Sequence, residues 1–201
     1  MVQLEPRAAG RPECANGLEN CVATARLDSV AGVTIRVSTA TTDDLPEIVG
    51  SVDALFATDA GAHNAAATNL RWAAENGIAY YTSLLADSGN LVLLARDDHE
   101  VAGHLVGRIR GPGSVHPIRV ADLESVHVYP AHRNRGVGEQ LVTVFFAWAA
   151  EKGAQRATVT AYAANEGARR FYARHGFAER SVTLDLDLPP APSATRSPDH
   201  G

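Results

Sequence analysis

Arg133-Asn134-Arg135-Gly136-Val137-Gly138 is the stretch of sequence that decides the fold. An alternating, strand-like segment ends just before it, near Tyr129, and an apolar helical stripe begins inside it, at Val137. A strand-to-helix turn of this kind directs backbone N–H groups, the positive end of a helix and two guanidinium groups toward one place. The stretch therefore predicts a binding site for a phosphate-rich anion.

Three interpretations compete for this loop when it is taken alone. A dinucleotide-binding fold requires G-x-G-x-x-G, but Leu141 stands three residues after Gly138, where that fingerprint needs a small residue. A P-loop requires Lys-Ser or Lys-Thr after its second glycine, and neither follows here. The third interpretation is a glycine-rich turn with surface arginines, so the segments around the loop have to decide.

The segments before the loop predict strands and helices from their apolar periods and their capping residues. In chain order we expect a strand over 33–37, a helix over 42–56, a loop over 58–64, a helix through Leu85 with an interruption at Asn76-Gly77, a hairpin over 91–95 and 101–109, and a strand over 120–129.

The segments after the loop alternate between helix and strand. We expect a helix from Val137 to Gly153, a strand over 157–161, a helix from Asn165 to Gly176, and a final half-exposed strand over 182–188, where the residues alternate strictly. A β-α-β order in this half, after a hairpin in the other, predicts a mixed α/β protein.

Several ordered motifs give the chain a specific resemblance. Arg133, Gly136 and Gly138 fill the pattern R/Q-x-x-G-x-G/A, and 121–130 is similar to the strand that precedes it in the GCN5-related N-acetyltransferase (GNAT) superfamily. The downstream residues Asn165, Ala168, Phe171-Tyr172 and Gly176-Phe177 resemble the N…A…FY…GF signature of that superfamily, and Ile35-Arg36 with 44–48 resembles its first strand and helix.

The resemblance implies a fold and a domain organisation. We expect an α/β (α+β) fold with a mixed, mostly antiparallel sheet of six to seven strands, a splayed central parallel pair and about four flanking helices. The acetyltransferase domain is expected over 33–188, between a weakly ordered N-terminal extension over 1–32 and a disordered tail over 189–201.

The resemblance also implies acetyl-CoA as the acyl donor. Its pantetheine arm would lie between the splayed strands and bind the backbone of Val126, His127 and Val128. Its pyrophosphate would bind the amides of the loop, contributed by Arg133, Asn134, Arg135, Gly136, Val137 and Gly138. A side chain at either glycine would stand where the phosphates approach. Asn165 is expected to cap its helix, to reach the cofactor arm, or to do both.

Transfer of an acetyl group to an amine requires a base and a proton for the leaving thiolate. Asp122 and Glu124 are the candidate bases, because they lie two apart on one strand face, which Val126 and Val128 would continue toward the cofactor. Glu124 is preferred, although either could be a surface carboxylate. Tyr172 matches the family's general acid, and the alternative is a core aromatic residue. His127 alternates away from the acid face and is expected to be structural.

Composition limits the partners. The chain has 18 basic and 23 acidic residues and a formal charge of −5, which disfavours binding to nucleic acid or to an anionic membrane. No His/Cys pattern predicts a metal, and no signal peptide or apolar span is present in the given sequence, so we expect a soluble, cytoplasmic protein. The expected acceptor is an amine of a small molecule or peptide, and a homodimer fits the resemblance. The alternative is a catalytically silent acyl-CoA-binding or sensor module.

Overall fold

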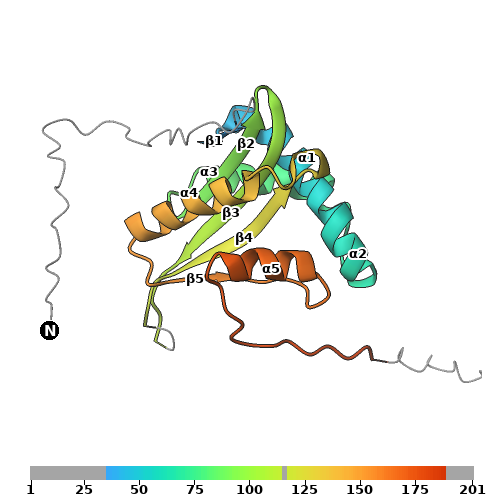
Figure 1. Ribbon diagram of the computed structural model, residues 1–201, viewed down its shortest axis with the longest axis vertical. Helices are drawn as coiled ribbons and strands as arrows, with labels where there is room; N and C mark the ends of the chain where they lie inside the picture. The colour runs from blue at the N-terminus through green and yellow to red at the C-terminus, as the bar shows by residue number, and fades with distance from the viewer. Residues whose placement is uncertain (1–34, 115–116, 189–201) are drawn as a thin grey trace, which may run out of the picture.

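The computed structural model describes residues 35–114 and 117–188. These form one five-stranded sheet and the helices that pack on it (Figure 1). The strands follow chain order across the sheet: β1 (Ile35–Thr39), β2 (Asn90–Asp97), β3 (Glu100–Arg110), β4 (Val120–Val128) and β5 (Arg156–Val159). Neighbouring strands are antiparallel from β1 to β4, whereas β4 and β5 are parallel. This confirms the predicted mixed class, the mostly antiparallel sheet and its parallel pair.

Helices cover both faces of this sheet. The apolar core on one face contains residues of α1 (Leu45–Leu55) and α3 (Trp72–Leu85), and the core on the other contains residues of α4 (Val137–Glu151). The remaining helices are the short α2 (Gly61–His63) and α5 (Glu166–Arg174), which follows β5. Single helical turns occupy η1 (Thr42–Asp44), η2 (Phe56–Ala60), η3 (Ala65–Ala67) and η4 (Pro130–His132).

β2 explains how one strand serves both cores. Leu91 and Leu93 pack on the α4 side, whereas Val92 and Leu94 pack on the side of α1 and α3. A strand covered on both faces carries a continuous apolar run, which is what this segment shows. The α4 side is closed by Phe145, which is fully buried. Truncation of such a residue to alanine costs about 3–5 kcal/mol.

Two local expectations in the first half of the chain were wrong. Gly77 does not interrupt α3: a Cβ atom there would lie 2.9 Å from a methyl of Val49, so the glycine permits close packing of α3 on α1. Residues 58–63 do not form a loop either. They lie in the wide, π-helical turn η2 and in α2, which continue α1 as helical backbone, and Asn64 ends the run.

The predicted helix ends are confirmed where polar caps exist. Thr41 and Asp44 form a capping box before α1, and Asn165 accepts a hydrogen bond from the backbone N–H of Ala168 at 3.0 Å at the start of α5. Gly153 and Gly176 follow α4 and α5 with φ of +70° and +85°. Left-handed backbone at this position is the usual helix stop, and glycine adopts it without a Cβ clash.

The prediction of six to seven strands was wrong for the described residues, which contain five. Residues 182–188 alternate as a strand should, yet they pair with no other strand in the described part of the chain. Val182, Leu184, Leu186 and Leu188 are 77–89% exposed. Alternation alone does not make a strand, because a strand is stabilised by backbone pairing with a neighbour.

The predicted extension over 1–32 and the tail over 189–201 lie outside the described residues. Within the described ranges, every helix is too short or too polar to cross a lipid bilayer.

Candidate functional site

The site begins where β4 and β5 part. Their parallel register runs from Val120 opposite Arg156 to Leu123 opposite Val159, and β5 ends there. β4 continues to Val128, so its last five residues have no strand neighbour on this edge among the described residues. Backbone N–H and C=O groups on such an edge are available to a ligand. After the helical turn η4, the loop 133–138 leads into α4 (Figure 1).

A β-bulge at Glu124 turns the end of β4. Val106 of β3 lies opposite Ser125, and the next residue, Gly107, lies opposite Leu123, so Glu124 is an extra residue without a partner. A bulge shifts the alternation of side chains by one position. The expected faces downstream of Glu124 are therefore exchanged.

Two predictions of orientation were wrong for this reason. Val126 and Val128 do not continue the face of the acids but pack against the α4 core. His127 does not alternate away from the acid face. It contacts Ser51 of α1, and α1 packs against α3 on the face of the sheet where Tyr80 of α3 binds Glu124. The regular period assumed for the whole strand fails at a single residue.

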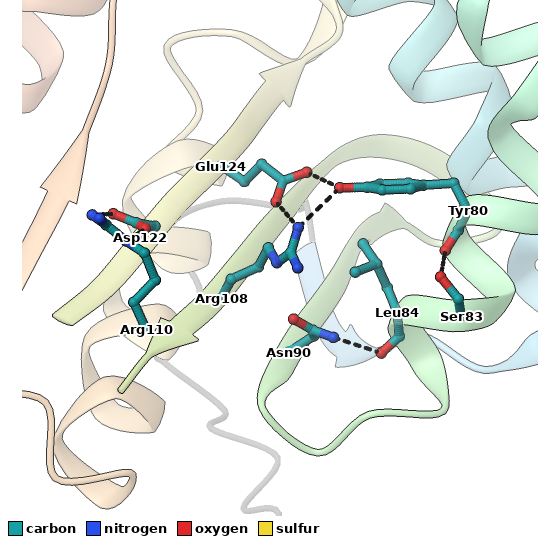
Figure 2. A network of polar contacts seen from close by, with 8 residues as sticks. All are labelled: Tyr80, Ser83, Leu84, Asn90, Arg108, Arg110, Asp122 and Glu124. Atoms are coloured by element: carbon teal, nitrogen blue, oxygen red, sulfur yellow. Dashed lines mark hydrogen bonds and ion pairs between the residues drawn. The ribbon is translucent and has the colours of Figure 1, made fainter. Parts of the chain in front are cut away.

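Glu124 is held by two donors (Figure 2). The hydroxyl of Tyr80 in α3 donates to Oε1 at 2.5 Å, and Nη1 of Arg108 in β3 lies 3.4 Å from Oε2. Arg108 also donates to the Tyr80 hydroxyl at 3.4 Å. Burial, followed by the hydrogen bond to Glu124, raises the pKa of Tyr80 to about 12. The two contacts fix the Glu124 side chain in position. It remains 32% exposed and is therefore accessible from solvent.

Asp122 is engaged differently, although it lies on the same face. Arg110 forms a two-pronged ion pair with it, with Nη2 at 2.7 Å from Oδ1, and Thr158 of β5 donates to the same oxygen. The carboxylate thus links β3, β4 and β5 at the closed end of the parallel pair. Of the two candidate bases, Glu124 is the one that lies where the strands have parted.

The two loop glycines have different reasons to be glycine. Gly136 precedes α4 with φ of +77°, and a Cβ atom there would meet nothing within 4 Å, so open space lies above the helix start. A Cβ atom at Gly138 would lie 3.1 Å from the ring of Phe171 in α5. Close helix packing, rather than space for a phosphate, is therefore the constraint that the structure shows at Gly138.

The remaining loop residues anchor the turn. Nε of Arg133 donates to the carbonyl of Val128 at 3.0 Å, which ties the loop to the end of β4. Arg135 forms an ion pair with Asp97 of β2 at 2.9 Å, and its Nη1 lies 3.1 Å from Nδ1 of His132. Asn134 is exposed at φ of +60°, and Val137 is buried in the core as the first residue of α4.

Tyr172 lies on α5 beside an acidic residue that the sequence analysis missed. Burial first, and then the charge of Asp59 in η2, raises the pKa of Tyr172 to about 12, so the phenol is protonated at neutral pH. Nδ2 of Asn165 donates to Oδ1 of Asp59 at 2.7 Å, while Oδ1 of Asn165 caps α5. Asn165 therefore caps its helix and connects α5 to η2.

His127 belongs to a buried polar cluster behind β4. Ser51 Oγ lies 2.7 Å from Nδ1 of His104 and 3.4 Å from Nδ1 of His127, and Nε2 of His104 lies 3.2 Å from Ser125 Oγ. Burial lowers the pKa of His104 to about 3 and, together with the charge of Arg133, that of His127 to about 4. Both imidazoles are neutral at pH 7, and the cluster joins α1 to the sheet.

Tyr80, Arg108 and Asp59 are the site residues that the sequence did not reveal. Tyr80 and Arg108 were in the expected helix and strand, but their meeting with Glu124 depends on strand register and helix rotation. Asp59 fell in a segment expected to be a loop. Its only sequence signal was a lone acid in a stretch of small residues, TDAGAH.

The comparisons with known proteins identify a family and structures of similar fold. The family model described as acetyltransferase (GNAT) family matches residues 54–177. No curated protein sequence matches this chain.

Three solved structures illustrate the similarity. A transcriptional regulator from Bacillus halodurans C-125 is 23% identical, with a TM-score of 0.61 and coverage of 78% of this chain and 100% of that one. The aminoglycoside N-acetyltransferase AAC(6')-Iy, solved with CoA, is 20% identical, with a TM-score of 0.62 and coverage of 78% and 96%. A ribosomal-protein-alanine N-acetyltransferase from Brucella melitensis is 18% identical, with a TM-score of 0.56 and coverage of 77% and 100%.

Proposed function

This chain belongs to the acetyltransferase (GNAT) family, and from that premise we propose that it transfers an acetyl group from acetyl-CoA to a primary amine of a small molecule or peptide. The reaction would be a direct attack within a ternary complex. The observation that carries the proposal is the free edge of β4 from Glu124 to Val128, which lies next to the loop that starts α4.

The donor fits the residues present. The backbone of Val126, His127 and Val128 offers hydrogen-bonding groups to the amides of a pantetheine arm along the free edge of β4. The amides from Arg133 to Gly138 and the positive end of α4 would hold the pyrophosphate. The open space above Gly136 supports that placement. A structurally similar acetyltransferase, AAC(6')-Iy, was solved with CoA bound.

Glu124 would serve as the base, directly or through a water molecule. An alkylammonium has a pKa of about 10.4, so at pH 7 the attacking nitrogen must lose a proton before it can form the C–N bond. Tyr80 and Arg108 fix the partly exposed carboxylate, and Glu124 is the first residue of β4 beyond its last pair with β5. The nitrogen lone pair attacks the thioester carbon, the C–S bond breaks, and one proton from the nitrogen is released to the base or solvent.

Tyr172 would act at the leaving sulfur. With its pKa raised to about 12, the phenol keeps its proton and donates a hydrogen bond to the developing thiolate. The reference pKa of a cysteine thiol is about 8.5, well below that of this phenol, so complete proton transfer from the phenol to an alkyl thiolate is uphill, and solvent restores the proton. Tyr172 therefore stabilises the leaving group mainly as a hydrogen-bond donor.

A catalytically silent acyl-CoA-binding module is the second candidate. The contacts of Glu124 with Arg108 and Tyr80 favour it, because a carboxylate held by two donors can join β4 to β3 and α3 without taking part in a reaction. The two functions differ in one observable, the release of free CoA in the presence of an amine.

The test is a transfer assay on the full chain. Acetyl-CoA is incubated with a panel of primary amines, free thiol is measured, and products are identified by a mass increase of one acetyl group. We expect Tyr172→Phe to lower kcat about 10- to 100-fold while leaving the affinity for CoA within about twofold. Glu151→Gln, at the exposed end of α4, is the matched control and should behave as wild type. CoA binding without transfer to any amine would favour the silent module.

A further inference from the structure

Asp59 differs from the other half-buried carboxylates of the described chain. Four of them form ion pairs with arginine: Asp44 and Glu47 with Arg96, Asp97 with Arg135, and Asp122 with Arg110. Asp59 instead accepts a hydrogen bond from the neutral amide of Asn165 at 2.7 Å. Nε2 of His63 lies 3.9 Å from the same oxygen, beyond hydrogen-bonding distance. Asp59 thus carries a charge that no arginine neutralises.

The position of Asp59 puts this charge inside the candidate site. It projects from η2 toward the N-terminus of α5, the helix that carries Tyr172. Tyr172 follows Asn165, the residue that Asp59 contacts, by about two turns of the same helix, and the charge of Asp59 contributes to the raised pKa of the phenol. The Asp59 side chain is 32% exposed, so it is reachable from solvent while its surroundings are partly dry.

A partly desolvated carboxylate that no arginine pairs with is a favourable place for a cation. The basic side chain at ion-pair distance from Asp59 is His63, which carries a charge only when it is protonated. The base, Glu124, already has Arg108 and Tyr80 as partners and would meet the reacting amine. A second acid without an arginine partner fits a second positive group on the same acceptor.

We propose that Asp59 binds a second ammonium group of the acceptor, so that the site selects amines with two or more positive charges. The inference rests on the proposed function, since it specifies the acceptor class of the same site. Asn165 is then a positioning residue: its Oδ1 caps α5, and its Nδ2 fixes the rotamer of Asp59.

Binding of two amines to the full chain tests this proposal independently of turnover. The probes are 1,4-diaminobutane and butylamine, which share the carbon chain and differ in one ammonium group. At low salt we expect the diamine to bind at least about tenfold more tightly, and added NaCl to reduce this ratio. A ratio near one at low salt in the wild-type protein would overturn the proposal.

Two variants locate the effect. Asp59→Asn keeps an oxygen that accepts from Asn165 but removes the charge, so the ratio should fall to about one while butylamine binding stays unchanged. Asp53→Asn, at an exposed position on α1, is the matched control and should keep the wild-type ratio. Equal weakening of both amines by Asp59→Asn would show a structural role for Asp59 and contradict the proposal.

Kinetics separate this inference from the proposed function. If transfer occurs, Asp59→Asn should raise KM for the diamine about tenfold more than KM for butylamine, while any change in kcat should be the same for the two amines. If no transfer occurs but the diamine preference is present and depends on Asp59, the acetylation proposal fails while the cation site stands. If transfer occurs with no diamine preference, only the cation site fails.

Discussion

The part of the site that follows residue 120 and the part that precedes it are built in different ways. The later part, from Glu124 on β4 to Gly138 at the start of α4, is continuous in the chain and spans 15 residues. The earlier part reaches the site through contacts between distant residues. The hydrogen bond from Tyr80 to Glu124 spans 44 residues, and that from Asn165 to Asp59 spans 106.

The two parts are therefore suited to different ligands. A continuous loop fixes backbone N–H groups and a helix end, which suit a constant partner such as a nucleotide phosphate. Side chains brought together from α1, η2 and α3 can change one at a time, without disturbing the loop. The later part is therefore suited to the acyl donor, and the earlier part to the acceptor.

The largest effect is expected at Gly136 in the later part. Gly136→Glu places a negative side chain in the open space where the phosphates are expected, and it forces a left-handed backbone on a residue other than glycine. The Kd for CoA should rise more than about 100-fold, measured by calorimetry. Gly136→Ala carries only the backbone strain, so a rise below about tenfold is expected. Gly113→Glu in the β3–β4 loop is the control, and an equal loss there would contradict the assignment.

The next effect concerns the contact between the two parts. Glu124→Gln should lower kcat about 100- to 1,000-fold, because an amide cannot take a proton, and Tyr80→Phe should lower it less, by about tenfold. CoA affinity should stay within about twofold in both variants, since neither side chain belongs to the loop. The measurement is a steady-state assay across pH. Wild-type kcat in Glu124→Gln would show that Glu124 is not the base.

A smaller effect distinguishes the two reasons for glycine at 138. Gly138→Ala should raise the Kd for CoA a few-fold, because the new methyl pushes on Phe171 and shifts α5. If Phe171 is the constraint, the double variant Gly138→Ala/Phe171→Leu should recover most of the lost affinity. If the methyl instead blocks a phosphate, the second substitution restores nothing. Calorimetry with CoA measures both variants.

The smallest effect is a pH dependence of stability from the cluster behind β4. The unfolded histidine pKa is about 6.5, and the folded values are about 3 for His104 and about 4 for His127. Between pH 6.5 and pH 4 the unfolded state therefore binds more protons, so stability falls as the pH is lowered through this window.

His104→Asn removes one of these groups and keeps a polar side chain. Its urea midpoint should depend less on pH between 6.5 and 4.5 than that of the wild type. Lost packing lowers the midpoint at all pH values and leaves this difference in slope. His99→Asn, in the exposed β2–β3 turn, is the control and should retain the wild-type slope. An unchanged slope in His104→Asn would contradict neutral burial of this imidazole.

Sequence reasoning was most successful where local rules determine structure. The hairpin of β2 and β3, the glycine stops of α4 and α5, and the cap at Asn165 follow from residues within a few positions. It failed where tertiary contacts decide. Gly77 suggested a break in a helix but serves the packing on Val49, and 182–188 has the period of a strand without a neighbour to pair with.

The site follows the same division. The strand, the turn that leads into α4 and the positions of the two acids on β4 were predicted from the sequence, but the bulge at Glu124 was not, because a bulge depends on the register with β3. That single residue reversed the expected orientation of Val126, His127 and Val128. Tyr80, Arg108 and Asp59 could not be identified, since only the folded chain brings them to Glu124, Asn165 and Tyr172.

We propose that the acyl donor binds along the free edge of β4. Amide hydrogen exchange at residue resolution, with and without acetyl-CoA, shows whether it binds there. We predict that acetyl-CoA slows exchange at Val126, Val128 and the amides from Arg133 to Gly138, while the amides of α3 change little. Slowed exchange confined to other segments, with β4 and the loop unaffected, would contradict the account.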